Sequence, residues 1–127
     1  MDRLLVVCFG GALGAGARYL VSLGSLRLLG PSFPYGTLIV NAVGSMLIAF
    51  IMHVSLVTTA VSPNLRLFLT TGILGGFTTY STFSYETLRY LQDGAWWLAC
   101  VNVAVTVLGC FVASVLGLWL GRALAGA

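Results

Sequence analysis

Long runs of apolar residues, separated by short polar or proline-containing turns, make up most of this chain. Four such runs can be placed without overlap, at residues 4–29, 36–60, 65–91 and 96–120. Each run exceeds the roughly 20 residues that a helix needs to cross a bilayer. The pattern therefore predicts an all-α integral membrane protein with four transmembrane helices. Only short loops and tails remain outside them, so we expect a single transmembrane domain over residues 1–127.

Composition agrees with this interpretation. Hydrophobic residues make up 59% of the chain and charged residues only 7%. Soluble domains carry about 25% charged residues, so this chain lacks the side chains that a water-exposed surface needs. A start that resembles a cleaved signal peptide is the weaker alternative, because cleavage would remove a glycine-rich helix that is suited to packing.

The distribution of arginines favours neither orientation of the chain in the membrane strongly. All six basic residues are arginines. Four spans would place Arg3, Arg66 and Arg122 on one side of the membrane. Arg27 and Arg89 would lie on the other side, a difference of one. Because orientation follows the Lys/Arg bias of short loops, two outcomes stay open. Either both orientations form and opposed copies pair as an antiparallel homodimer, or one arginine sets a single orientation.

Small residues recur at a spacing that favours close helix contacts. GxxxG pairs let helix backbones approach each other in lipid. The chain has three of them, Gly10/Gly14, Gly72/Gly76 and Gly117/Gly121. The sequence does not decide which pairs pack within one chain and which pack between chains.

Polar residues inside the first two spans are candidate functional positions. Arg18 lies well within the first run, where a charge is costly and indicates either function or snorkelling to the interface. A vestibule that attracts anions would satisfy both interpretations. Thr37, Asn41 and Ser45 follow at steps of four on one helix face. For Asn41, an interhelical hydrogen bond is favoured over a role as an N–H donor in a pathway.

The third span contains a predicted break. Gly75 and Gly76 are followed by Thr78 and Thr79, which are all weak helix formers. Carbonyls freed at such a break can coordinate a cation. The helix that restarts there presents free N–H groups and a positive dipole end, which suit an anion.

The restarted segment combines aromatic rings with hydroxyls. Tyr80 and Phe83 are three residues apart. Hydroxyl residues lie between and after them, namely Ser81, Thr82, Ser84 and Thr87. Ring edges carry partial positive charge, and neutral donors bind an ion weakly enough to release it. The fourth span has a quieter polar stripe at Asn102 and Thr106, for which a pathway and interhelical packing are almost equally good explanations.

Enzymatic activity is not expected. The chain has no P-loop, HExxH or GxSxG motif. Its single histidine, His53, and a single acid in the third span, Glu86, give little material for acid–base chemistry. Nothing in the pattern indicates a nucleic-acid partner.

Two segments resemble the signatures of the Fluc (CrcB) fluoride channels of microbes. They are residues 36–45, GTLIVNAVGS, and residues 72–86, GILGGFTTYSTFSYE. The resemblance extends to residues 14–18 of the first span and to the overall length. It implies a dual-topology antiparallel homodimer with two pores in the prokaryotic inner membrane, surrounded by membrane lipid. Its expected activity is passive, selective export of cytoplasmic fluoride, which lowers fluoride toxicity.

The resemblance also assigns roles to individual residues. Asn41 matches the pore asparagine, and Tyr80 and Phe83 match two fluoride-facing phenylalanines. Gly75 and Thr78 match positions whose backbone carbonyls hold a central, structural Na⁺ at the dimer interface. The remaining expected positions are Ser81, Thr82, Ser84, Asn102 and Thr106 along the fluoride pathway and Arg18 and Thr37 toward the vestibule.

One position departs from the family pattern. Tyr80 stands where these channels usually have phenylalanine. The phenol adds a donor and bulk, which would bind fluoride more tightly, narrow the pore or redirect the ring.

Two other functions compete with the channel. A proton-coupled exporter of the small multidrug-resistance type is also a four-helix, dual-topology dimer, but it needs an acid in the membrane, typically in the first span, where this chain has Arg18. A structural subunit held by its GxxxG faces would not require the hydroxyl-rich broken helix.

Overall fold

The computed structural model describes residues 2–126, and every regular element in this range is a helix. Three helices are long and apolar enough to cross a membrane. They are α1 (Asp2–Leu29), α2 (Tyr35–Val57) and α6 (Trp96–Ala125). They cover the first, second and fourth predicted spans, and the all-helical prediction is confirmed over the described range.

The third predicted span is divided into shorter pieces. They are α3 (Pro63–Leu67), the π-helix η1 (Phe68–Leu74), α4 (Gly75–Phe77) and α5 (Tyr80–Gln92). The first three run on without a gap, and a two-residue break separates them from α5. The span is therefore two half-helices in sequence.

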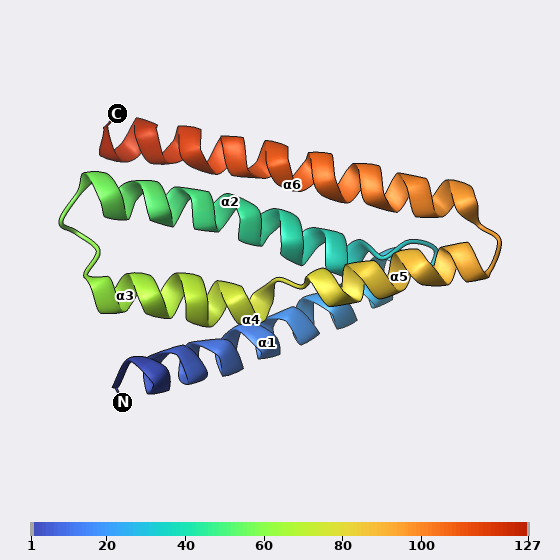
Figure 1. Cartoon of the computed structure of the whole chain (residues 1–127), viewed down its shortest axis with the longest axis horizontal. Coiled ribbons are helices and arrows are strands. Elements are labelled where there is room, and N and C mark those ends of the chain that lie inside the picture. The colour runs from blue at the N-terminus through green and yellow to red at the C-terminus, as the bar shows by residue number, and fades with distance from the viewer. Residues whose placement is uncertain (1, 127) are drawn as a thin grey trace.

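The helices run up and down through the molecule (Figure 1). Both ends of the chain lie at one end of the bundle, together with the connection between α2 and α3. The α1–α2 and α5–α6 connections lie at the opposite end. This is the arrangement of four spans that place both tails and the second loop on one side.

Local chemistry sets the helix ends. Gly30 ends α1 with φ +80°, a conformation that glycine adopts without strain, and its N–H donates to the Leu26 carbonyl at 3.1 Å. Ser62 caps α3 by accepting a hydrogen bond from the Leu65 N–H at 3.2 Å. The second helix ends at Val57, three residues before the predicted end, because Thr58 takes an extended conformation.

Glycines bring α1 into backbone contact with the first half of the third span. A Cβ placed on Gly14 would collide with the Ile73 carbonyl oxygen, and one on Gly76 would collide with the Gly11 carbonyl oxygen. A Cβ on Gly10 would come within 2.9 Å of the Gly72 Cα. Only glycine permits this approach, so these two GxxxG pairs pack against each other within the chain.

The third GxxxG pair joins α6 to α2. A Cβ on Gly117 would collide with the Met46 carbonyl oxygen, and one on Gly121 would come within 3.0 Å of the His53 ring. All three GxxxG pairs are therefore used inside one chain, which answers the question that the sequence left open.

The outer surface is apolar. Leu28 is 86% exposed, Trp97 77% and Leu124 77%. Few large side chains are buried, because lipid rather than a protein core accepts these residues. Together with the three spanning helices, this surface identifies a multi-pass membrane protein.

Candidate functional site

The break in the third span lies at two threonines. Thr78 has φ −83° and ψ 160°, and Thr79 has φ −153° and ψ 123°, so both are extended. The predicted interruption is confirmed, but Gly75 and Gly76 before it stay helical. The requirement for glycine is instead clear at Gly76, where the α1 backbone approaches.

The side chain of Asn41 pairs with the backbone of Thr79 across the break. Its Nδ2 donates to the Thr79 carbonyl at 2.9 Å, and its Oδ1 accepts from the Thr79 N–H at 2.8 Å. One amide group thus satisfies both backbone groups of a residue that is 8% exposed. We call this pair of hydrogen bonds the clasp. The interhelical hydrogen bond expected of Asn41 is present.

Thr79 also starts the second half-helix. Its hydroxyl caps α5 by accepting a hydrogen bond from the Thr82 N–H at 3.2 Å, and it donates to Thr82 Oγ1 at 3.0 Å. Ser81 Oγ lies 3.4 Å from the same hydroxyl. The positive end of the α5 dipole is therefore fixed directly beside the clasp.

A groove of about 400 Å³ opens beside the break, between α2, the third span and α6. We call it the outer groove. Its lining includes Asn41, Ser45, Thr70, Gly75, Thr78, Thr79, Tyr80, Phe83, Thr106 and Cys110. Six of the predicted site residues are brought together here, namely Asn41, Gly75, Thr78, Tyr80, Phe83 and Thr106.

The two aromatic rings of the groove differ in exposure. Phe83 is 8% exposed, whereas Tyr80 is 79% exposed, although their ring centroids are only 5.8 Å apart at an interplanar angle of 59°. Phe83 is part of the interior of the chain. The exposed Tyr80 ring shows that one side of the groove is open in a single chain.

Several hydroxyl protons are already used within the third span. Ser84 donates to the Tyr80 carbonyl at 3.0 Å, and Thr87 donates to the Phe83 carbonyl at 2.9 Å. Such bonds to the preceding turn are common for hydroxyls in helices. In this conformation these hydroxyls present lone pairs, rather than protons, to their surroundings.

The polar pair on α6 is divided between two roles. Asn102 is 1% exposed and donates to Thr87 Oγ1 at 2.9 Å, so it ties α6 to α5. It lines neither the outer groove nor the second cavity described next. Thr106, at 7% exposed, does line the outer groove.

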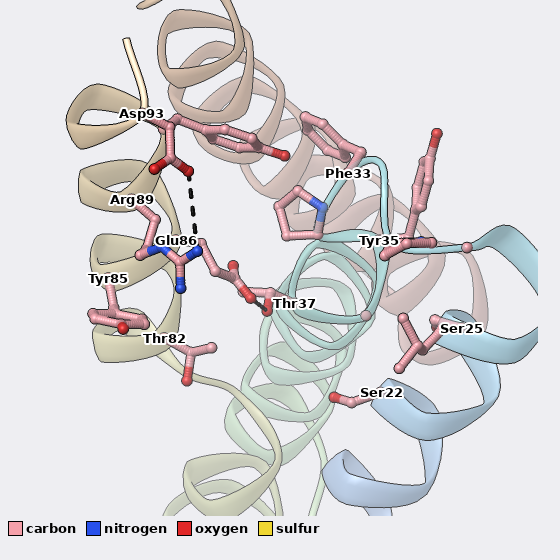
Figure 2. Close-up of a pocket in the computed structure, with 16 residues that line it drawn as sticks. Ser22, Ser25, Phe33, Tyr35, Thr37, Thr82, Tyr85, Glu86, Arg89 and Asp93 are labelled. Carbon is pink, nitrogen blue, oxygen red and sulfur yellow. Dashed lines mark hydrogen bonds and ion pairs between the residues drawn. The ribbon is translucent and has the colours of Figure 1, made fainter. Parts of the chain in front are cut away.

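The second cavity lies at the end of the molecule that holds the α1–α2 connection (Figure 2). This end cavity has a volume of about 560 Å³. Its lining includes Ser22, Ser25, Phe33, Tyr35, Thr37, Thr82, Tyr85, Glu86, Arg89, Tyr90 and Asp93. Thr37, predicted near a vestibule, and Thr82, predicted along the pathway, both lie here.

A carboxylate occupies the middle of the end cavity. Thr37 donates to Glu86 Oε1 at 2.7 Å, as Figure 2 shows. The other oxygen, Oε2, is buried and has no hydrogen-bond partner among the described residues. A buried carboxylate oxygen is costly without a donor. Arg89 does not supply one, because its guanidinium faces Asp93 at 4.0 Å.

Arg18 lies at the break rather than in either of these two cavities. Its Nη1 donates to the Thr78 carbonyl at 3.5 Å, a long hydrogen bond. Described residues contain no cluster of three His, Cys, Asp or Glu side chains that would hold a metal. Gly75 and Thr78, whose carbonyls the family resemblance assigns to Na⁺, both line the outer groove.

The sequence analysis gave no place in the site to two residues that the structure makes central. Thr79 joins the clasp to the start of α5, and Glu86 lies in the end cavity. The spacing gave one usable signal for each: Thr79 is the last weak helix former before the helix restarts, and Glu86 is the only acid between Asp2 and Asp93.

Comparisons with known proteins agree with these observations. The family model "CrcB-like protein, Camphor Resistance (CrcB)" matches residues 5–118. A protein of Anaeromyxobacter sp. (strain K), named fluoride-specific ion channel FluC, is 56% identical over 126 residues, covering 99% of this chain and 100% of the relative. A protein of the same name from Citrifermentans bemidjiense is 47% identical over 98% of this chain and 100% of its own length. Both are named as ion channels rather than enzymes, and neither name supports a coupled exporter.

Proposed function

This chain belongs to the CrcB-like protein family, and from that premise we propose that it is a fluoride-selective channel of a prokaryotic inner membrane. The names of its relatives support fluoride as the ion. The observation that carries the proposal is the outer groove, where a fixed amide, a hydroxyl and two aromatic rings meet beside a broken helix. Passive efflux through this groove would lower cytoplasmic fluoride.

The groove offers neutral donors to an anion. Asn41 Nδ2 carries two protons, of which the clasp uses one, so the second is available to an ion in the groove. Thr106 adds a hydroxyl, and the Phe83 ring adds a partially positive edge. Neutral groups bind a small anion without the strong attraction of a full charge, which allows it to leave again.

The conduction pathway we propose is completed by a second copy. Tyr80 is 79% exposed, and the groove that it lines is open on one side. A second copy covering this opening would enclose the ion, and two such grooves would give two pores. The near balance of arginines supports copies of opposite orientation, because neither orientation is strongly favoured.

The carbonyls of Gly75 and Thr78 are the candidates for holding the Na⁺ ion that the family resemblance implies. In a continuous helix the Gly75 carbonyl would accept from the Thr79 N–H, but that N–H donates to Asn41 instead. The Thr78 carbonyl receives only a long hydrogen bond from a cationic group, Arg18. The Gly75 oxygen is thus left for a hard cation, whereas at the Thr78 oxygen Na⁺ would have to displace the Arg18 guanidinium, which has the same charge.

Fluoride efflux tests the proposal. Purified protein would be placed in liposomes loaded with potassium fluoride, and external fluoride would be followed with an electrode after a potassium ionophore is added. We expect rapid fluoride release and none of chloride from matched vesicles. If well-folded protein releases no fluoride but Tyr80→Phe does, the Tyr80 phenol blocks conduction. The absence of fluoride release from both proteins would contradict the proposal that the chain is a fluoride channel.

A further inference from the structure

We propose that Asn41 is a positioning residue that pairs with the extended backbone at the break and fixes the start of α5. The inference extends the proposed function and rests on it only for its transport readout. It assigns to the clasp the tasks of pairing the extended backbone at Thr79 and of holding the first turn of α5 in place, while other contacts keep the two half-helices apart.

The clasp replaces a helical hydrogen bond. A continuous helix would direct the Thr79 N–H to the Gly75 carbonyl. Asn41 Oδ1 takes that N–H at 2.8 Å, and Nδ2 binds the Thr79 carbonyl at 2.9 Å. Without Asn41 the Thr79 N–H would be unsatisfied within a membrane-spanning segment, where such a group is costly. A side chain from α2 therefore makes the extended conformation tolerable.

The clasp also fixes the orientation of the amide. Reversing the amide would place a donor against the Thr79 N–H and an acceptor against its carbonyl. Asn41 consequently holds its remaining N–H in one direction, and its side chain lines the outer groove. An ion in the groove would meet a donor that is already oriented, which limits the reorganisation that binding requires.

Both halves of the third span are anchored independently of the clasp. Gly76 fixes the first half to α1, and Asn102 ties α5 to α6 through Thr87. The halves cannot easily rejoin into one helix when the clasp is lost. The freed Thr79 N–H is then left without a strong acceptor, and the first turn of α5, with Tyr80 and Phe83, loses its fixed position.

Hydrogen exchange at the Thr79 amide tests the inference. Protein labelled with ¹⁵N-threonine would be measured by NMR in lipid nanodiscs, as wild type, Asn41→Leu and Asn41→Ser. Leucine removes both bonds, whereas serine keeps a hydroxyl donor at the groove but is too short to reach both groups of Thr79. We expect the Thr79 amide to exchange faster in both variants, on the order of tenfold. If the leucine variant does not fold, the serine variant alone decides.

Thr106→Val is the matched control for exchange. It removes a buried hydroxyl from the outer groove but leaves both hydrogen bonds of the clasp intact. The exchange rate of the Thr79 amide is therefore expected to stay at the wild-type value. Fluoride transport should fall in Asn41→Ser together with the loss of protection. If the Thr79 amide of Asn41→Ser exchanged at the wild-type rate, the positioning role of Asn41 would be overturned. A wild-type protein that carries no fluoride would defeat the proposed function but leave the exchange result standing.

Discussion

The two halves of the third span are held in place by different forces. The half before the break packs its backbone against α1, through Gly72 and Gly76. The half after the break is held by side-chain hydrogen bonds, from Asn41 at its start and from Asn102 farther along. One half depends on the absence of side chains and the other on the presence of particular ones.

This difference predicts how each half responds to change. A backbone contact between helices is steric, so any added atom must push the helices apart. A hydrogen bond can be lost singly, and its net contribution in a membrane is modest. The first half should therefore tolerate almost no substitution at its glycines, whereas the second half should lose stability in small steps.

The largest effect is expected at the α1 contact. In Gly14→Val the new side chain meets the Ile73 carbonyl, which cannot move aside. We expect a loss of more than about 3 kcal/mol, above the usual range for overpacking, because the opposing atoms belong to the backbone. Reversible unfolding in mixed detergent micelles would measure it.

Gly16→Val is the control on the same helix. No atom lies within 4 Å of a Cβ placed there, so the change should stay within about 0.5 kcal/mol of wild type. Equal losses at Gly14 and Gly16 would show that helix α1 does not pack through one glycine face.

A smaller effect is expected in the second half. Asn102→Leu removes the bond to Thr87 and leaves that hydroxyl without its donor. We expect a loss of about 1 kcal/mol, in line with measured interhelical bonds in membrane proteins. Adding Thr87→Val should cost little more, because the bond is already gone. Fully additive losses in this double-mutant cycle would show that the two side chains are not coupled.

The smallest effect on stability is expected at the exposed ring. Tyr80→Phe should change the free energy of unfolding by less than about 0.5 kcal/mol, because the side chain is 79% exposed. If the phenol narrows the pathway, fluoride efflux from liposomes should be equal to or faster than wild type. A clear loss of flux with unchanged stability would instead assign the phenol a donor role toward the ion.

Much of the fold was predictable from the sequence because lipid imposes a simple rule. Apolar runs long enough to cross the membrane locate α1, α2 and α6 to within a few residues at most ends. The end of α6 differs most, since the helix continues past residue 120 to Ala125. Arg122 in its last turn suits the negative end of the helix dipole.

The details of the site were less predictable because they depend on contacts between distant segments. Weak helix formers located the break, but the sequence could not show that Gly76 stays helical while Thr79 does not. That outcome follows from Gly11 and Asn41, which lie 65 and 38 positions away. Spacing placed Asn102 beside Thr106 on one stripe, yet only Thr106 lines the groove. Roles at the dimer interface and at a cation remain predictions of the family resemblance.

The break has a consequence for how the protein is made. During synthesis, the translocon releases segments into lipid according to their apolar length. Neither half of the third span is a long apolar helix, and α5 carries hydroxyls, Glu86 and Arg89. Its entry into the bilayer would therefore depend on partners already in place, α1 for the first half and Asn41 of α2 for the break. The ribosome synthesises α1 and Asn41 before residue 63. The partners that the third span needs are therefore already in the membrane when this poorly inserting segment emerges.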